Sequence, residues 1–228
     1  MIGVFLLVPV ALLAQTFFSS FARVAVNNAF WATEEFWFFS LGAVLWVLAF
    51  FGGIWASGEP RLLRVYVFGH ELTHAIWVWV MGGQVSEFKV TREGGFIMTD
   101  THNVWVALSP YFYPVYSVGV IVVYGLLSAF YDVSPYTSHL FACIGFTWAF
   151  HLCFALWMIP KGQSDLTQFG TFYSLVIIAG MNLVLLVALL ILAAPEVTFA
   201  VFGLELLRNT ENFAAFAWKY LGPILHVY

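Results

Sequence analysis

The sequence predicts an all-α, polytopic membrane protein with about six transmembrane helices and a small β-hairpin. Of its 228 residues, 62% are hydrophobic and only 9% are charged. The mean hydropathy is +0.91, and several apolar runs approach the roughly 20 residues that cross a bilayer. The net charge of −4 is small and dispersed, so nothing in the composition favours nucleic acid as a partner. We therefore expect an integral, multi-pass protein surrounded by lipid.

Polar and Gly/Pro-rich breaks divide the chain into its predicted spans. Ser57-Gly58-Glu59-Pro60 ends the second span, and Gly82-Gly83 ends the third, because glycine commonly terminates helices. Pro110 and Pro114 fall within the fourth span, where neighbouring helices can satisfy the carbonyls that proline leaves free. The spans are expected at about residues 2–19, 36–56, 61–81, 103–130, 137–159 and 165–194.

Residues 84–101 have a different character from the spans around them. Apolar side chains such as Val85, Phe88 and Ile97 are interleaved with charged ones, and Glu93-Gly94-Gly95 is a turn signal. This pattern predicts a β-hairpin at the membrane surface, with a plain solvated loop as the alternative.

His70-Glu71-Leu72-Thr73-His74 places an HExxH motif in the third predicted span. On one helix, residues i and i+4 lie about 40° apart and about 6 Å along the axis, so His70 and His74 can grip one Zn²⁺ ion. Glu71 can act as general base on a water molecule at that ion. Each charged group near a bilayer centre costs roughly 2.5–3.5 kcal/mol. Binding of a metal ion would explain why three such side chains occur together in this span. The structural alternative is that the two histidine side chains only form hydrogen bonds with carbonyl groups and bind no metal.

A catalytic zinc commonly has three protein ligands, so a third must come from elsewhere in the chain. In the six-span arrangement, Asp165 begins the sixth span on the side toward which the HExxH helix runs. An ordinary helix cap is the other explanation for that aspartate. Asp100, His102 and His151 remain alternative ligands.

The motif and its surroundings resemble the site-2-protease family of intramembrane zinc metalloproteases. The matching parts are Gly69 to Ala75, Gly82-Gly83, the hairpin-like stretch and the late Asp165. The likeness covers about residues 60–194, without extra soluble domains. The family often has Asn-Pro before its aspartate and Gly after it, whereas this chain has Pro160-Lys161-Gly162-Gln163-Ser164-Asp165-Leu166. It therefore looks like a divergent, minimal member.

The resemblance implies cleavage of a membrane-protein substrate in or near its transmembrane segment. We expect one membrane domain, 1–228, with N-terminal spans in 1–59, a catalytic core in 60–194 and an amphipathic segment or short span in 195–228. The edge of the hairpin is expected to hold an extended substrate by β-addition. Asn103 is a candidate substrate-binding residue, although it also suits a helix cap.

Three other functions compete with this interpretation. One is the other membrane HExxH protease type, whose third ligand is a later glutamate, but residues 94–195 contain no glutamate. A second is a non-proteolytic metal-binding protein or transporter, although transport sites usually draw polar residues from several broken spans. The third is an inactive protease relative that binds transmembrane helices without cutting them.

Overall fold

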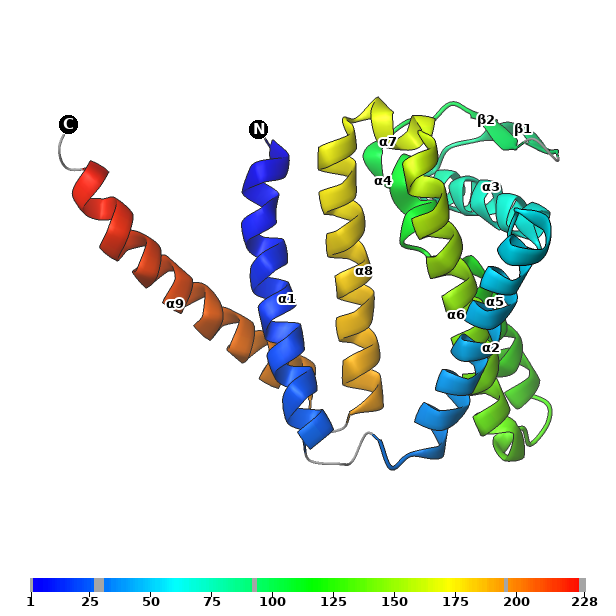
Figure 1. The fold of residues 1–228 in the computed structure, drawn as a ribbon, viewed down its shortest axis with the longest axis horizontal. Coiled ribbons are helices and arrows are strands. Elements are labelled where there is room, and N and C mark those ends of the chain that lie inside the picture. Colours follow the sequence, from blue (N-terminus) through cyan, green and yellow to red (C-terminus); the bar gives the residue numbers. More distant parts are fainter. Residues whose placement is uncertain (1, 27–30, 92–93, 195–196, 226–228) are drawn as a thin grey trace. The chain divides into compact units, whose positions relative to one another are not determined.

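A computed structural model describes residues 2–26, 31–91, 94–194 and 197–225. The fold is mostly helical, 79%, with one small antiparallel sheet (Figure 1). The chain divides into two compact units, residues 33–178 and residues 1–32 with 179–228. The boundaries differ from those of the three predicted regions, because residues 33–59 belong to the unit that holds the HExxH motif.

The unit of residues 33–178 contains most of the elements. In chain order they are α2 (Glu34–Ser57), α3 (Leu63–Val80), β1 (Val85–Val90), β2 (Gly95–Thr99), α4 (Val104–Leu108), the 3₁₀ turn η1 (Ser109–Tyr111), α5 (Val115–Ser128), η2 (Ser134–Tyr136), α6 (Thr137–Met158), η3 (Ile159–Lys161), α7 (Ser164–Gln168) and the first turns of α8 (Thr171–Ala193).

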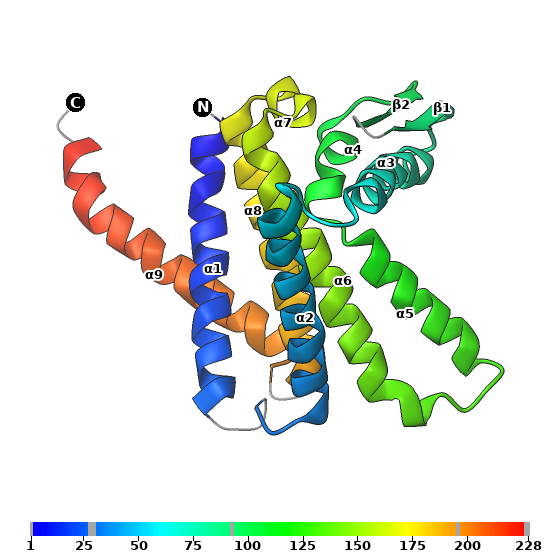
Figure 2. The same ribbon diagram turned by 45° about the vertical axis from the view of Figure 1, so that its right-hand side comes forward.

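Helices α2 and α6 lie side by side along the length of this unit (Figure 2). Their backbones approach closely at Gly42 and Gly145: a Cβ atom at Gly145 would lie 2.0 Å from the carbonyl oxygen of Phe39. Small residues at such crossings are what permit tight helix packing. Next to this crossing, an aromatic core joins α2, α3 and α6, and it consists of Trp46, Phe50, Tyr66, Val67, Phe150 and Phe154.

Helix α3 carries the HExxH motif and ends where the sequence predicts. Gly82 adopts a left-handed φ of 78°, and the N–H of Gly83 donates to the carbonyl of Val78 at 2.9 Å. The ring of Tyr116 from α5 lies against Gly69, where a Cβ atom would approach it to 2.5 Å. Glycine directly before the motif thus lets α5 pack against the helix that presents both histidines.

The predicted β-hairpin is confirmed. Strands β1 and β2 pair in antiparallel register, with an irregularity between Val85 and Glu87. Glu93 of the predicted turn lies outside the described residues. The hairpin packs beside α3, where the rings of Phe68 and Phe88 meet edge to face at 5.8 Å. This contact lies between the hairpin and the helix that carries the HExxH motif.

The helices of the structure differ from the six predicted spans in three places. In the described residues, four helices are long and apolar enough to cross a membrane, or five if a bent pair counts as one. Helix α3 is not among them, because its arginine, histidines and glutamate lower its hydropathy. The fourth predicted span bends by 80° between residues 111 and 115, beside Pro114. The sixth is interrupted at Gly170, which has a φ of +90°, so α7 is separate from α8.

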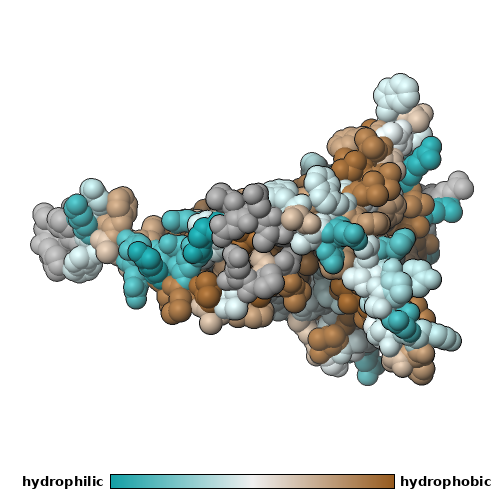
Figure 3. Space-filling model, turned by 90° about the horizontal axis from the view of Figure 1, so that it is seen from below, coloured by the Kyte–Doolittle hydropathy of each residue, from teal (hydrophilic) through white to brown (hydrophobic). Residues whose placement is uncertain are grey.

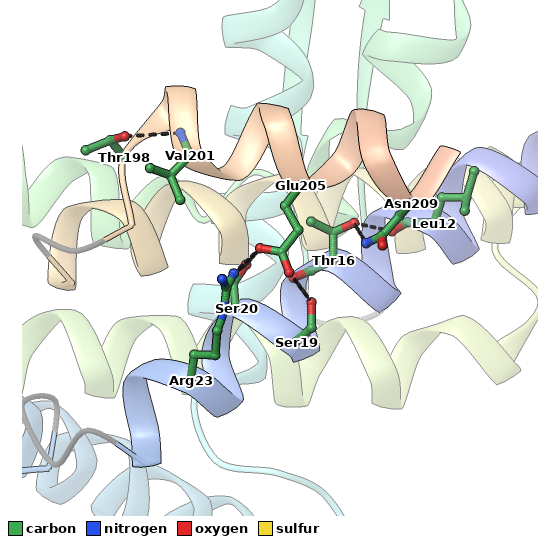
Figure 4. Close-up of polar contacts among 9 residues, drawn as sticks. All are labelled: Leu12, Thr16, Ser19, Ser20, Arg23, Thr198, Val201, Glu205 and Asn209. Atoms are coloured by element: carbon green, nitrogen blue, oxygen red, sulfur yellow. Dashed lines mark hydrogen bonds and ion pairs between the residues drawn. The ribbon is translucent and has the colours of Figure 1, made fainter. Parts of the chain in front are cut away.

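The second unit contains α1 (Ile2–Val26), the remainder of α8 and α9 (Phe199–Leu225). A polar cluster joins α1 to α9, as Figure 4 shows. The carboxylate of Glu205 forms an ion pair with Arg23 and accepts hydrogen bonds from Ser19 and Ser20. One turn further along α9, Asn209 donates to Thr16 of α1. The predicted segment 195–228 is therefore one helix over 199–225, and it is not among the candidate spans.

The outer surface is rich in apolar side chains, which form large brown areas in Figure 3. On α2, for example, Trp55 is 91% exposed and Leu48 is 65% exposed. Exposed apolar surface of this extent is unusual for a protein in water. Together with the candidate spans, it is compatible with an integral membrane protein.

Candidate metal centre

Two elements bring three metal-ligating side chains together. His70 and His74 stand one turn apart on α3, and their rings lie 4.8 Å apart, edge to face. Asp165 on α7 approaches both, with its Oδ2 atom 3.2 Å from Nε2 of His70 and 3.6 Å from Nε2 of His74. One ligand atom from each of the three residues lies within 4.8 Å of the others, so the group could bind a metal ion.

The second nitrogen of each histidine ring has its own partner. Nδ1 of His74 lies 2.7 Å from the carbonyl oxygen of Val106, so it carries the proton that it donates there. Nδ1 of His70 lies 3.3 Å from the hydroxyl of Tyr66. Such outer contacts fix the orientation and tautomer of metal-binding histidines. Both rings therefore turn Nε2 toward Asp165.

Asp165 is held by the fold as well as by the histidines. The hydroxyl of Tyr111, a fully buried residue of η1, donates to Oδ2 at 3.2 Å. Leu166 anchors α7 in the interior, and its carbonyl accepts a hydrogen bond from Ser174 at 3.0 Å. Burial favours a raised pKa for Asp165, but the hydrogen bonds with the two histidines hold its pKa below the ordinary value. The carboxylate is thus in its ionised, ligand-competent form.

Glu71 lies beside the three candidate ligands, in the same cavity. It is 6% exposed, and its side chain lies against the backbone of Gly95, where a Cβ atom would be only 2.6 Å from Cγ of the glutamate. The cavity has a volume of about 390 Å³. The four side chains share its lining with the start of β2, with α4 and with α7. A carboxylate therefore stands next to the possible metal position in a space large enough for a ligand.

Asn103 also lines the cavity, and its side chain caps α4. Its Oδ1 atom accepts hydrogen bonds from the N–H groups of Trp105 and Val106, both at 3.0 Å, while Nδ2 lies 3.0 Å from the sulfur of Met81. This geometry matches the cap that the sequence allows, and the role of Asn103 in substrate binding stays a prediction.

The three alternative ligands are not part of the group in the described structure. His102 lines the cavity but does not join the other three. The carboxylate of Asp100 accepts hydrogen bonds from Gln84 and Thr101, and the backbone N–H of Gln84 holds its pKa below the usual value. His151 is buried behind α3 and is hydrogen-bonded to the backbone of Tyr111.

Sequence reasoning missed the residues that orient the ligands. Tyr66 had a usable signal, because it lies four residues before His70 and so faces the same side of α3. Tyr111 and the carbonyl of Val106 had none, because they reach the site through the packing of α4 and η1 against α3. Gly95 was assigned to a turn, without any indication that its backbone would meet Glu71.

Comparisons of the chain with models of known families, with curated proteins and with solved structures found no match. The arguments about function below therefore rest on the site itself.

Proposed function

We propose that this protein is an intramembrane zinc metalloprotease that hydrolyses peptide bonds in or near a transmembrane segment of a membrane-protein substrate. One observation carries the proposal: Nε2 of His70, Nε2 of His74 and a carboxylate oxygen of Asp165 converge, with Glu71 beside them in a cavity. The HExxH spacing supports the same chemistry independently.

Two of the three distances between the proposed ligand atoms fit a tetrahedral metal ion such as zinc. Ligand atoms about 2.0–2.1 Å from a tetrahedral zinc lie about 3.3 Å from one another. The two distances from Asp165 to the histidine nitrogens, 3.2 Å and 3.6 Å, are close to that value. Two imidazoles and one carboxylate also leave a fourth position open, which is the arrangement of catalytic rather than structural zinc sites.

When bound, Zn²⁺ would polarise the scissile carbonyl and lower the pKa of a coordinated water. Glu71 would take a proton from the attacking water and deliver it to the nitrogen of the leaving amine as the C–N bond breaks. The contact with Gly95 holds the glutamate side chain at the cavity wall. Val106, Tyr66 and Tyr111 hold the three ligands, so little reorganisation is needed at the moment of reaction.

The apolar surface and the candidate spans support a substrate that is itself embedded in the membrane. A helical substrate keeps its carbonyls in internal hydrogen bonds, so it must unwind before hydrolysis. Strand β2 belongs to a two-stranded sheet and lines the cavity, so an extended segment can pair with its edge beside Glu71.

Metal analysis combined with a cleavage assay tests the proposal. The detergent-purified protein should hold one zinc per chain and cut a single-span reporter whose transmembrane segment contains a Gly-Pro break. Glu71→Gln should keep the zinc and lose at least about 100-fold in cleavage rate, because it removes the general base. Cleavage by Glu71→Gln at the wild-type rate would remove Glu71 from that role. Zinc binding without any cleavage by the wild type would favour a metal-binding protein or an inactive relative.

A further inference from the structure

Two glutamine side chains line the cavity but do not belong to the group of candidate metal ligands. Gln163, the half-buried N-cap residue of α7, and Gln168, the exposed last residue of α7, lie on either side of Asp165 in the sequence, and both line the cavity. In the part of the chain that the structure describes, neither amide group has a hydrogen-bond partner, whereas the amide of Asn103 is engaged at both ends. Helix α7 and the hairpin meet α4 and α3 at the same end of their unit (Figure 2).

We propose that Gln163 and Gln168 bind the backbone of an extended, uncharged peptide segment and align it over the metal centre. This inference rests on the proposed function and names the substrate contact of the same site. A glutamine amide offers both a donor and an acceptor, which match the carbonyl and N–H of a peptide group. No lysine or arginine lines the cavity among the described residues, so the lining provides no such side chain that would favour acidic residues in the bound segment.

The two glutamines stand at opposite ends of α7. Gln163 is its N-cap residue, with an extended backbone, and Gln168 is its last residue. Each amide can therefore contact a different peptide group of one extended segment. Strand β2 lines the same cavity, so a bound segment would find backbone partners on β2 and side-chain partners on α7.

Two hydroxamates separate this contact from metal binding. Acetohydroxamate reaches only the metal, whereas N-acetyl-Leu-Leu-hydroxamate adds two peptide groups. Their dissociation constants are measured by calorimetry on the zinc-loaded full chain in detergent, for the wild type, Gln163→Met and Gln168→Met. Methionine keeps the length of glutamine and removes its hydrogen-bonding groups. We expect each variant to weaken the peptide hydroxamate roughly 3- to 10-fold, the effect of one lost neutral hydrogen bond. The affinity for acetohydroxamate should not change.

Thr167→Val is the matched control on α7. Thr167 is exposed, does not line the cavity, and donates its hydroxyl hydrogen bond to the carbonyl of Ser164. Its replacement should leave both affinities unchanged. Equal peptide-hydroxamate affinity in the wild type and both glutamine variants would overturn the inference, and so would an equal weakening of both probes. If neither hydroxamate binds the zinc-loaded wild type, the proposed metal centre fails instead.

Discussion

Gly95→Ala should disable the proposed general base without removing the metal. A Cβ atom at this position would lie 2.6 Å from Cγ of Glu71 and 2.9 Å from its Oε1. Carbon atoms in ordinary contact are at least about 3.5 Å apart, so the glutamate or the strand must move by about 0.9 Å. Because misplacing a reacting group by about 1 Å can cost about 100-fold in rate, we expect a loss of that size.

Cleavage of the single-span reporter gives the rate, and metal analysis of the same samples gives the zinc content. Gly119→Ala is the control, since nothing lies within 4 Å of a Cβ atom there and α5 accommodates alanine. Gly95→Ala should keep one zinc per chain, because the three atoms nearest to the added methyl group all belong to Glu71 and none to a proposed ligand. A fully active Gly95→Ala variant would refute the close contact between β2 and Glu71. Loss of zinc would show that the hairpin supports the ligands and not only the glutamate.

Three further substitutions test the ligand, its support and the helix packing. Asp165→Ala should weaken zinc binding, measured by competition with a chromophoric chelator, and unchanged stoichiometry would transfer the third ligand to another residue. Tyr111→Phe removes the hydrogen bond to Asp165, so zinc affinity in the same assay should fall about 10- to 100-fold; an unaltered dissociation constant would contradict that support. Gly145→Ala places a methyl group against the backbone of α2 and should destabilise the fold by about 1–3 kcal/mol, seen as a lower thermal midpoint. A midpoint equal to that of Gly119→Ala would disprove the close crossing of α2 and α6.

The parts of the fold that the sequence predicts well depend on short-range rules. Helix α3 ends at Gly82 because glycine adopts a left-handed conformation at little cost. The hairpin follows from alternating side chains around a glycine turn. The sequence did not predict the changes in helix direction at Pro114 and Gly170. Mean hydropathy is calculated over a window of about 20 residues, so it is insensitive to a change of direction within that window.

The sequence places the two histidines and the proposed third ligand, Asp165, for different reasons. The spacing of His70 and His74 is fixed by one helix, so the sequence is sufficient to place both on the same face. Asp165 was favoured by comparing membrane sides and depths along the predicted spans, although α3 is not among the candidate spans and α7 is not part of α8. What brings Asp165 to the histidines is the turn of α7, with Leu166 buried and the carboxylate held by Tyr111. Tyr111 lies in η1, which packs against α3 just before the 80° break. The contact that holds Asp165 therefore comes from tertiary packing between separate elements, which no local rule of the sequence specifies.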